Sequence, residues 1–187
     1  MGVANANKVI STNQIDCSGS LRVTLALTAT PDIMSNPTDI VLVLDRSGSM
    51  TGAPLAAMKT GADTFIDIIA QATGGVGEIG SGSRIGIVSF AGTATADTQF
   101  ITSVDTLKDA VDALTAGGNT NHADAFAQAT ALFDPQSSNA KVIVMFTDGN
   151  TTTGAPPAPV AAAAKAQGII IYCIGLGGSD GVDPNTL

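Results

Sequence analysis

The chain has 187 residues, of which 44% are hydrophobic and 13% charged, and its formal net charge is −8. These totals predict a single domain of ordinary size with a small appendage at most, and they exclude a disordered chain. The eight basic residues are scattered singly, so nucleic acid and anionic membrane surfaces are poor partner candidates, whereas divalent cations are better ones. No apolar run is long enough for insertion into a membrane, and we expect no signal peptide in residues 1–9.

Residues 1–36 differ from the rest of the chain and predict a β-hairpin. In LRVTLALTAT, leucine and valine alternate with smaller or more polar residues, which is typical of a strand with one covered face. KVISTNQID is a second strand candidate that could pair with it across the turn CSGS at 17–20. We therefore expect an N-terminal hairpin extension over 1–36 and a separate domain over 37–187.

From residue 37 onward, strand patterns alternate with helix patterns. The candidates for fully buried parallel strands are IVLVL (40–44), KVIVMF (141–146) and IIIYCIG (169–175), and RIGIVSF (84–90) is similar but carries Gly86. ADTQFITS (96–103) is short and polar, which fits an antiparallel edge strand beside RIGIVSF. IVLVL has the most uniformly apolar run and should lie in the centre. The predicted order across the sheet is ADTQFITS, RIGIVSF, IVLVL, KVIVMF, IIIYCIG.

Apolar residues at helical spacing predict helices between these strands. Three stripes are Leu55, Met58, Ala62, Phe65 and Ile69; Leu107, Val111 and Leu114; and Phe126, Ala129 and Phe133. A fourth, alanine-rich segment at 156–168 closes at Gly168. Alternating strands and helices predict an α/β fold, namely a doubly wound, Rossmann-like, mostly parallel sheet of order 3-2-1-4-5 with helices on both faces.

Oxygen-bearing side chains gather where three of these segments end. They are Asp45, Ser47 and Ser49 after IVLVL, Thr120 in the loop GGNTNH (117–122), and Asp148 after KVIVMF. Ligands of open parallel sheets bind outside the carboxyl ends of the strands, so we expect these side chains to converge. Two carboxylates and three hydroxyls suit a hard cation, and the weak charge of the set favours Mg²⁺ or Mn²⁺ over Ca²⁺. Asp45→Ala should then abolish magnesium binding and leave the fold nearly intact, on the premise that the site lies on loops.

A helix cap or a turn is the simpler explanation of the same residues, since Asp and Ser favour both. Asn119 and Asn121 fit loop-shaping roles, and His122 fits the start of a helix. If a ligand does bind at this edge, the candidate rim residues are Arg46, Asn119, Asn121, His122 and Asn150.

The residues needed for catalysis are missing from the sequence. The chain has one histidine, and neither of its two cysteines lies in a reactive context, so nucleophilic and acid–base chemistry lack their usual groups. We therefore expect no enzymatic activity. Whether Cys17 and Cys173 form a disulfide is left open, because two cysteines do not define a disulfide framework.

Three short motifs together resemble the von Willebrand factor type A domain over residues 38–187. These motifs are DRSGSM after an apolar strand, GGNTN about 70 residues later, and FTDG after another strand. In that family the three segments form the metal-ion-dependent adhesion site. The resemblance implies that the hydroxyls of Ser47, Ser49 and Thr120 contact the metal. It also implies that Asp45 and Asp148 hold the metal directly or through water.

The resemblance also carries expectations about the whole protein. The family usually has one more strand and helix, so we expect VDPNTL (182–187) to begin that helix and the chain to be a piece of a larger multidomain protein. The segment VLVLDRSGSM most resembles the corresponding segment of bacterial extracellular members of the family.

The leading hypothesis is a metal-dependent adhesion or protein-binding module of a bacterial surface or secreted protein. In it, an Asp or Glu carboxylate of the ligand completes the coordination of Mg²⁺. The alternative is an intracellular assembly subunit that works with an ATPase or a chelatase, which would place the chain in the cytoplasm. The low charge content and abundant Thr, Ala and Gly favour the first hypothesis and an extracellular or cell-surface location.

Overall fold

The computed structural model describes residues 5–10, 23–28 and 36–176, and the chain divides into two compact units, Met1–Asp32 and Ile33–Leu187. In the first unit, β1 (Asn5–Ile10) pairs antiparallel with β2 (Val23–Thr28), and Asn5 lies opposite Thr28. The unit thus contains the two paired strands of the expected hairpin. The expected turn at 17–20 lies outside the described residues, as does the expected helix start at 182–187.

In the second unit, the described residues form one five-stranded sheet. Its strands are β3 (Thr38–Asp45), β4 (Arg84–Phe90), β5 (Ala94–Ala96), β6 (Ala140–Thr147) and β7 (Ile169–Gly175). They lie in the order β5-β4-β3-β6-β7, with β5 antiparallel to β4 and all other neighbours parallel. This order confirms the predicted 3-2-1-4-5 arrangement, with IVLVL of β3 in the centre.

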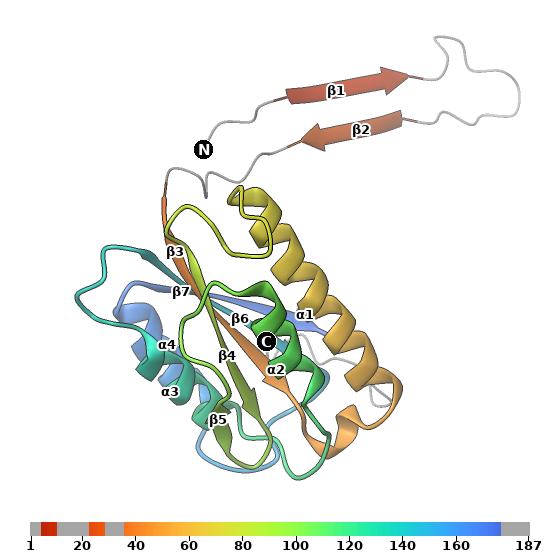
Figure 1. Ribbon diagram of the computed structural model, residues 1–187. Coiled ribbons are helices and arrows are strands. Elements are labelled where there is room, and N and C mark those ends of the chain that lie inside the picture. The colour runs from red at the N-terminus through yellow and green to blue at the C-terminus, as the bar shows by residue number, and fades with distance from the viewer. Residues whose placement is uncertain (1–4, 11–22, 29–35, 177–187) are drawn as a thin grey trace, which may run out of the picture. The chain divides into compact units, whose positions relative to one another are not determined.

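Two helices cover each face of this sheet (Figure 1). The helices are α1 (Ala53–Ala72) and α2 (Val104–Asp112) on one face, and α3 (His122–Leu132) and α4 (Pro157–Ala166) on the other. A short 3₁₀ helix, η1 (Gly48–Met50), follows β3. Leu42 and Leu44 of β3 pack under α1 and α2, while Val41 and Val43 pack under α3 and α4. A strand buried on both faces has no polar face, which explains the uninterrupted apolar run of β3.

Local sequence signals set where these helices begin and end. Pro54 occupies the first turn of α1, where its missing N–H costs no hydrogen bond. Asn121 caps α3, because its side-chain oxygen accepts a hydrogen bond from the Asp124 N–H at 3.1 Å. Beyond α4, Gly168 adopts a φ of 80°, a conformation that glycine reaches without steric cost.

Truncating Leu42 should strongly destabilise the domain, because its side chain is completely buried in the central strand. We expect Leu42→Ala to lower the free energy of unfolding by about 3 kcal/mol, from lost burial and the cavity left behind. Urea denaturation measures this loss. Ile170→Ala in β7 is the matched control, since Ile170 is 50% exposed and should cost less than about 1 kcal/mol. Equal losses in the two variants would contradict the assignment of β3 as the core strand.

The predicted edge strand at 96–103 is displaced. β5 consists of residues 94–96, and beyond it Ile101 forms only an isolated bridge with Ile85. Side chains replace part of the ladder: the Asp97 carboxylate accepts the Ser89 N–H at 2.6 Å, and the Thr98 hydroxyl accepts the Ile87 N–H at 2.9 Å. These two side chains accept hydrogen bonds from N–H groups of β4 that would otherwise pair with the backbone of a regular edge strand.

The prediction that IIIYCIG is fully buried was wrong for one of its faces. Ile169, Ile171 and Cys173 belong to the core under α3 and α4, but the alternate residues Ile170 and Tyr172 are 50% and 58% exposed. The reason is that β7 is the edge strand of the described sheet, and no described helix covers its other face fully. Cys173 is a half-buried free thiol, while Cys17 lies outside the described residues.

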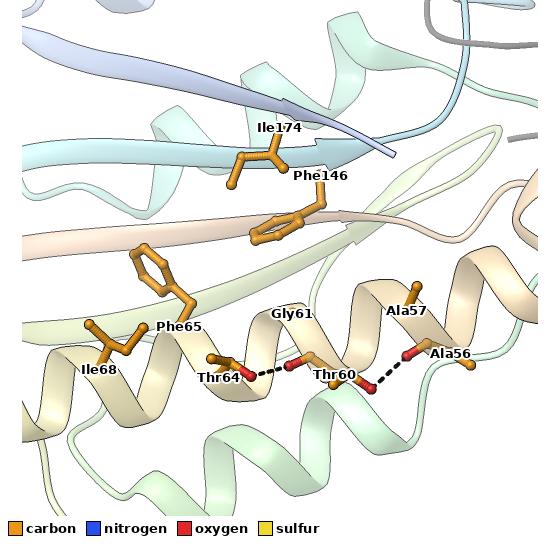
Figure 2. A pocket seen from close by; sticks show the side chains of 9 residues that line it. All are labelled: Ala56, Ala57, Thr60, Gly61, Thr64, Phe65, Ile68, Phe146 and Ile174. Atoms are coloured by element: carbon orange, nitrogen blue, oxygen red, sulfur yellow. Dashed lines mark hydrogen bonds between the residues drawn. The ribbon is translucent and has the colours of Figure 1, made fainter. Parts of the chain in front are cut away.

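A groove of about 660 Å³ separates this exposed face of the sheet from α1 (Figure 2). Phe146 of β6 and Ile174 of β7 reach from the sheet toward the helix, and Phe65 reaches from α1 toward the sheet. The middle of α1 presents small residues to the groove, among them Ala57 and Gly61, which leave the space between helix and sheet incompletely filled.

Candidate metal centre

The three predicted site segments meet at the carboxyl ends of β3 and β6. Backbone hydrogen bonds join the first two: the Gly48 N–H donates to the Gly118 carbonyl at 2.9 Å, and the Gly117 N–H donates to the Arg46 carbonyl at 2.8 Å. The loop after β6 joins them through Thr120, whose carbonyl accepts from the Thr152 N–H at 2.9 Å. Residues far apart in the sequence are therefore held together by the backbone itself.

Asp45 is the last residue of β3 and is completely buried. Its Oδ1 accepts a hydrogen bond from the Ser47 N–H at 2.8 Å, and its Oδ2 accepts one from the Thr147 hydroxyl at 2.6 Å. These two donors compensate part of the cost of burying the carboxylate. The premise that the site lies on loops was therefore wrong for Asp45, which belongs to β3. Asp45→Ala would leave both donors without their acceptor, so we do not expect it to leave the fold intact.

The remaining candidate ligands form a short chain of oxygens that opens to solvent. The Ser47 and Ser49 hydroxyls lie 3.1 Å apart, and the Ser49 hydroxyl donates to Oδ1 of Asp148 at 2.9 Å. Ser47 and Asp148 are buried, whereas Ser49 is exposed. Thr120 is also buried, and its hydroxyl forms no hydrogen bond with any described residue, although its N–H donates to the Thr152 hydroxyl at 2.8 Å.

This donor set fits a hard divalent cation. All five side chains offer oxygen, which Mg²⁺ and Mn²⁺ prefer over nitrogen or sulfur. Among the described residues, no group of three or more His, Cys, Asp or Glu side chains is placed to hold a metal. A cation at this edge would therefore depend on the hydroxyls together with Asp45 and Asp148.

The structure places the five predicted rim residues in different surroundings. Arg46 points away toward β4, where its Nε donates to the Ser89 hydroxyl at 3.2 Å. Asn121 caps α3 and also donates to the Gly92 carbonyl at 3.2 Å, so its role is structural. Asn119 and Asn150 are exposed, as rim residues should be. His122 is 6% exposed, although it lines a cavity together with Asn150.

Sequence reasoning missed Thr147 and Thr151, which surround His122. The ring Nε2 of His122 lies 3.1 Å from the Thr147 hydroxyl oxygen, and Nδ1 lies 2.9 Å from that of Thr151. The Phe90 ring packs against the imidazole with centroids 5.1 Å apart. Burial lowers the pKa of His122, and the nearby Asp45 carboxylate only partly offsets this. The sequence carries no signal for these contacts, because they depend on the register of the parallel strands, which puts Leu44 opposite Phe146 and hence Asp45 beside Thr147.

Comparison with protein-family models identifies the family of this domain. The von Willebrand factor type A domain model matches residues 39–187 of the chain. The chain belongs to this family. Type A domains are protein-interaction and adhesion modules, so the domain is of that general class. A search of curated proteins found no match.

Several solved structures share the fold. BatB from Bacteroides thetaiotaomicron is 22% identical, with a TM-score of 0.62, over 74% of this chain and 66% of its own. The von Willebrand factor domain of the type V pili tip protein Mfa5 from Porphyromonas gingivalis is 24% identical, with a TM-score of 0.56, over 62% and 39%. Proximal thread matrix protein 1 from the mussel byssus, with a zinc-occupied MIDAS motif, is 24% identical, with a TM-score of 0.62, over 75% and 36%. The chain thus spans two thirds or less of the length of these structures.

Proposed function

We propose that this type A domain binds a protein ligand through a magnesium or manganese ion held at the carboxyl ends of β3 and β6. The observation that carries the proposal is the continuous oxygen cluster of Ser47, Ser49 and Asp148 beside the buried Asp45. The mussel protein supports it, because its structure contains a metal in the corresponding kind of motif. Ser47, Ser49 and Thr120 would provide hydroxyl ligands, and Asp45 and Asp148 the negative charge.

The charge of the site explains why a partner carboxylate should complete it. A bound cation would supply concentrated positive charge, and two carboxylates with three neutral hydroxyls leave room for one more anionic ligand. Protein donors already occupy one lone pair on each oxygen of Asp45, which reduces the charge that it can offer. On a chain with a net charge of −8, the ion would also be a local attraction for an acidic residue of the partner.

A binding role fits the site better than catalysis. The only histidine is buried with both ring nitrogens in hydrogen-bond contact, so it is not available as an acid or base for a substrate. We therefore propose a non-enzymatic adhesion module that belongs to a multidomain surface or secreted protein. The similarity to a pili tip domain supports this location. No helix within the described parts of the chain has the length and apolar character to cross a membrane.

Ligand binding should depend completely on the cation. We expect the domain to bind one or more proteins of an extracellular-matrix panel in Mg²⁺. Affinity should fall at least about 100-fold in chelator and return when Mg²⁺ is restored. Surface plasmon resonance with immobilised panel proteins measures this. Exchange of the contacted acidic residue of the ligand for its amide should reproduce the loss, whereas equal binding with and without chelator would contradict a carboxylate bridge.

A further inference from the structure

A chain of polar side chains leads to Asp45 and includes no other proposed metal ligand. It starts at the Thr151 hydroxyl, passes through both nitrogens of the His122 ring, and reaches the Thr147 hydroxyl. That hydroxyl ends the chain on Oδ2 of Asp45. Asp45, Thr147 and His122 are at most 6% exposed, so water does not compete for the contacts among these three, whereas Thr151 is half-buried.

The number of protons fixes the direction of every hydrogen bond in this chain. An ionised carboxylate only accepts, so the single hydroxyl proton of Thr147 must point at Asp45. The Thr147 oxygen can then only accept from His122, which requires the proton of a neutral imidazole to sit on Nε2. Nδ1 is left with a lone pair and must accept the hydroxyl proton of Thr151. All three donors therefore point toward Asp45.

We propose that His122 is a positioning residue that uses its Nε2–H tautomer to orient Thr147 and thereby hold the Asp45 carboxylate in place for the cation. An imidazole that only filled space could be replaced by an apolar side chain of similar size, because Phe90 packs against its ring. Such a side chain could not donate to Thr147, whose oxygen would then keep only the longer hydrogen bond from the Gly149 N–H at 3.3 Å. The effect on the cation rests on the proposed metal site, whereas the direction of the hydrogen bonds does not.

The tautomer is measurable without any metal. His122 is the only histidine of the chain, so a long-range ¹H–¹⁵N correlation spectrum of the untagged, metal-free protein at neutral pH shows its two ring nitrogens without ambiguity. We expect a protonated Nε2 and an unprotonated Nδ1. A ring protonated on Nδ1, or one that exchanges between both tautomers, would overturn the proposed chain of donors.

Two substitutions at His122 separate positioning from packing. In His122→Gln, the amide nitrogen can reach the place of Nε2 and donate to Thr147, so magnesium affinity should stay within about threefold of wild type. In His122→Leu this donor is gone, and affinity should fall about 10- to 100-fold, as is usual when a partner of a metal ligand is lost. Isothermal titration calorimetry with Mg²⁺ measures both variants.

Thr147→Val tests the same link without touching the histidine, because it keeps the shape of the side chain and removes the hydroxyl that binds Asp45, together with the acceptor of the Gly149 N–H. It should lower magnesium affinity as His122→Leu does. Phe126→Leu is the matched control, since Phe126 lies one turn further along α3, is equally buried and makes no polar contact with Asp45. It should lose stability but keep wild-type affinity.

The outcomes distinguish this proposal from the proposed function. Wild-type affinity in both His122→Leu and Thr147→Val would overturn the positioning role and leave the metal site standing. A wild-type protein that binds no magnesium would instead overturn the metal site, and the tautomer would still decide whether His122 directs its donors at Asp45.

Discussion

Replacing Asp45 by asparagine is expected to remove nearly all of the stabilisation that magnesium gives to the domain. A ligand present at about 100 times its dissociation constant stabilises a folded protein by about 2.7 kcal/mol. Asp45→Asn removes one of the two proposed carboxylate ligands among the described residues, so we expect the affinity to fall about 100-fold or more. At the same magnesium concentration the stabilisation then falls to about 0.4 kcal/mol.

Asparagine is the better test because its side-chain oxygen can still accept a hydrogen bond from the Ser47 N–H, whereas alanine leaves that N–H without an acceptor. Thermal unfolding with and without Mg²⁺ measures the difference for each protein. Asp109→Asn in α2 is the matched control, since it removes the same charge from an exposed position away from the site. Stabilisation of Asp45→Asn and wild type to the same extent would show that the cation, if bound, lies elsewhere.

The sequence was sufficient to predict the strand order, and the reason lies in β3. A strand buried on both faces of an α/β sheet consists of apolar residues without interruption, and such runs are rare enough to identify the centre of the sheet. β5 and β7 were predicted less well because their environment depends on neighbours. Asp97 and Thr98 replace the ladder with side-chain hydrogen bonds, and Tyr172 is exposed because no described helix covers it.

In the candidate site too, some features could be predicted from the sequence and others depend on neighbouring elements. The convergence of Asp45, Ser47 and Asp148 could be predicted because each lies at or just after the carboxyl end of a strand whose place in the fold is known. The pairing of His122 with Thr147 could not, because it depends on the register between β3 and β6 and on the depth at which α3 begins. His122 is the first residue of α3, and its burial became apparent only in the structure, where it is 6% exposed and the Phe90 ring packs against it.

The second large effect is expected at the opposite end of β3, where Asp39 is completely buried. Arg84 of β4 binds it with two hydrogen bonds, Nε to Oδ1 at 2.9 Å and Nη2 to Oδ2 at 2.8 Å. Asn139 and Ser137 donate to the same carboxylate at 2.9 and 3.2 Å. This cluster joins β3 and β4 to the segment that precedes β6.

Asp39→Ala should lower the free energy of unfolding by about 3 kcal/mol, because it leaves these donors without their common acceptor. We expect the low end of the range for buried pairs, since the Arg84 side chain is 40% exposed and can still bind water. Asp67→Ala is the matched control. Its partner Lys108 lies 2.7 Å away, but Asp67 is 58% exposed, so the loss should stay below about 1 kcal/mol. Urea denaturation at pH 7 compares the two variants.

The contribution of Asp39 should also disappear in acid, in a direction that its environment fixes. Burial alone would raise the pKa of Asp39, but the hydrogen bonds from Arg84, Asn139 and Ser137 and the charge of Arg84 lower it below its ordinary value of about 4. A depressed pKa in the folded state means that the stabilisation is complete above about pH 4 and is lost as the pH falls through the folded-state value. The difference in unfolding free energy between wild type and Asp39→Ala should therefore be constant from pH 7 to about pH 4 and shrink below it. A difference that persists unchanged to pH 2 would show that the carboxylate charge does not hold this cluster together.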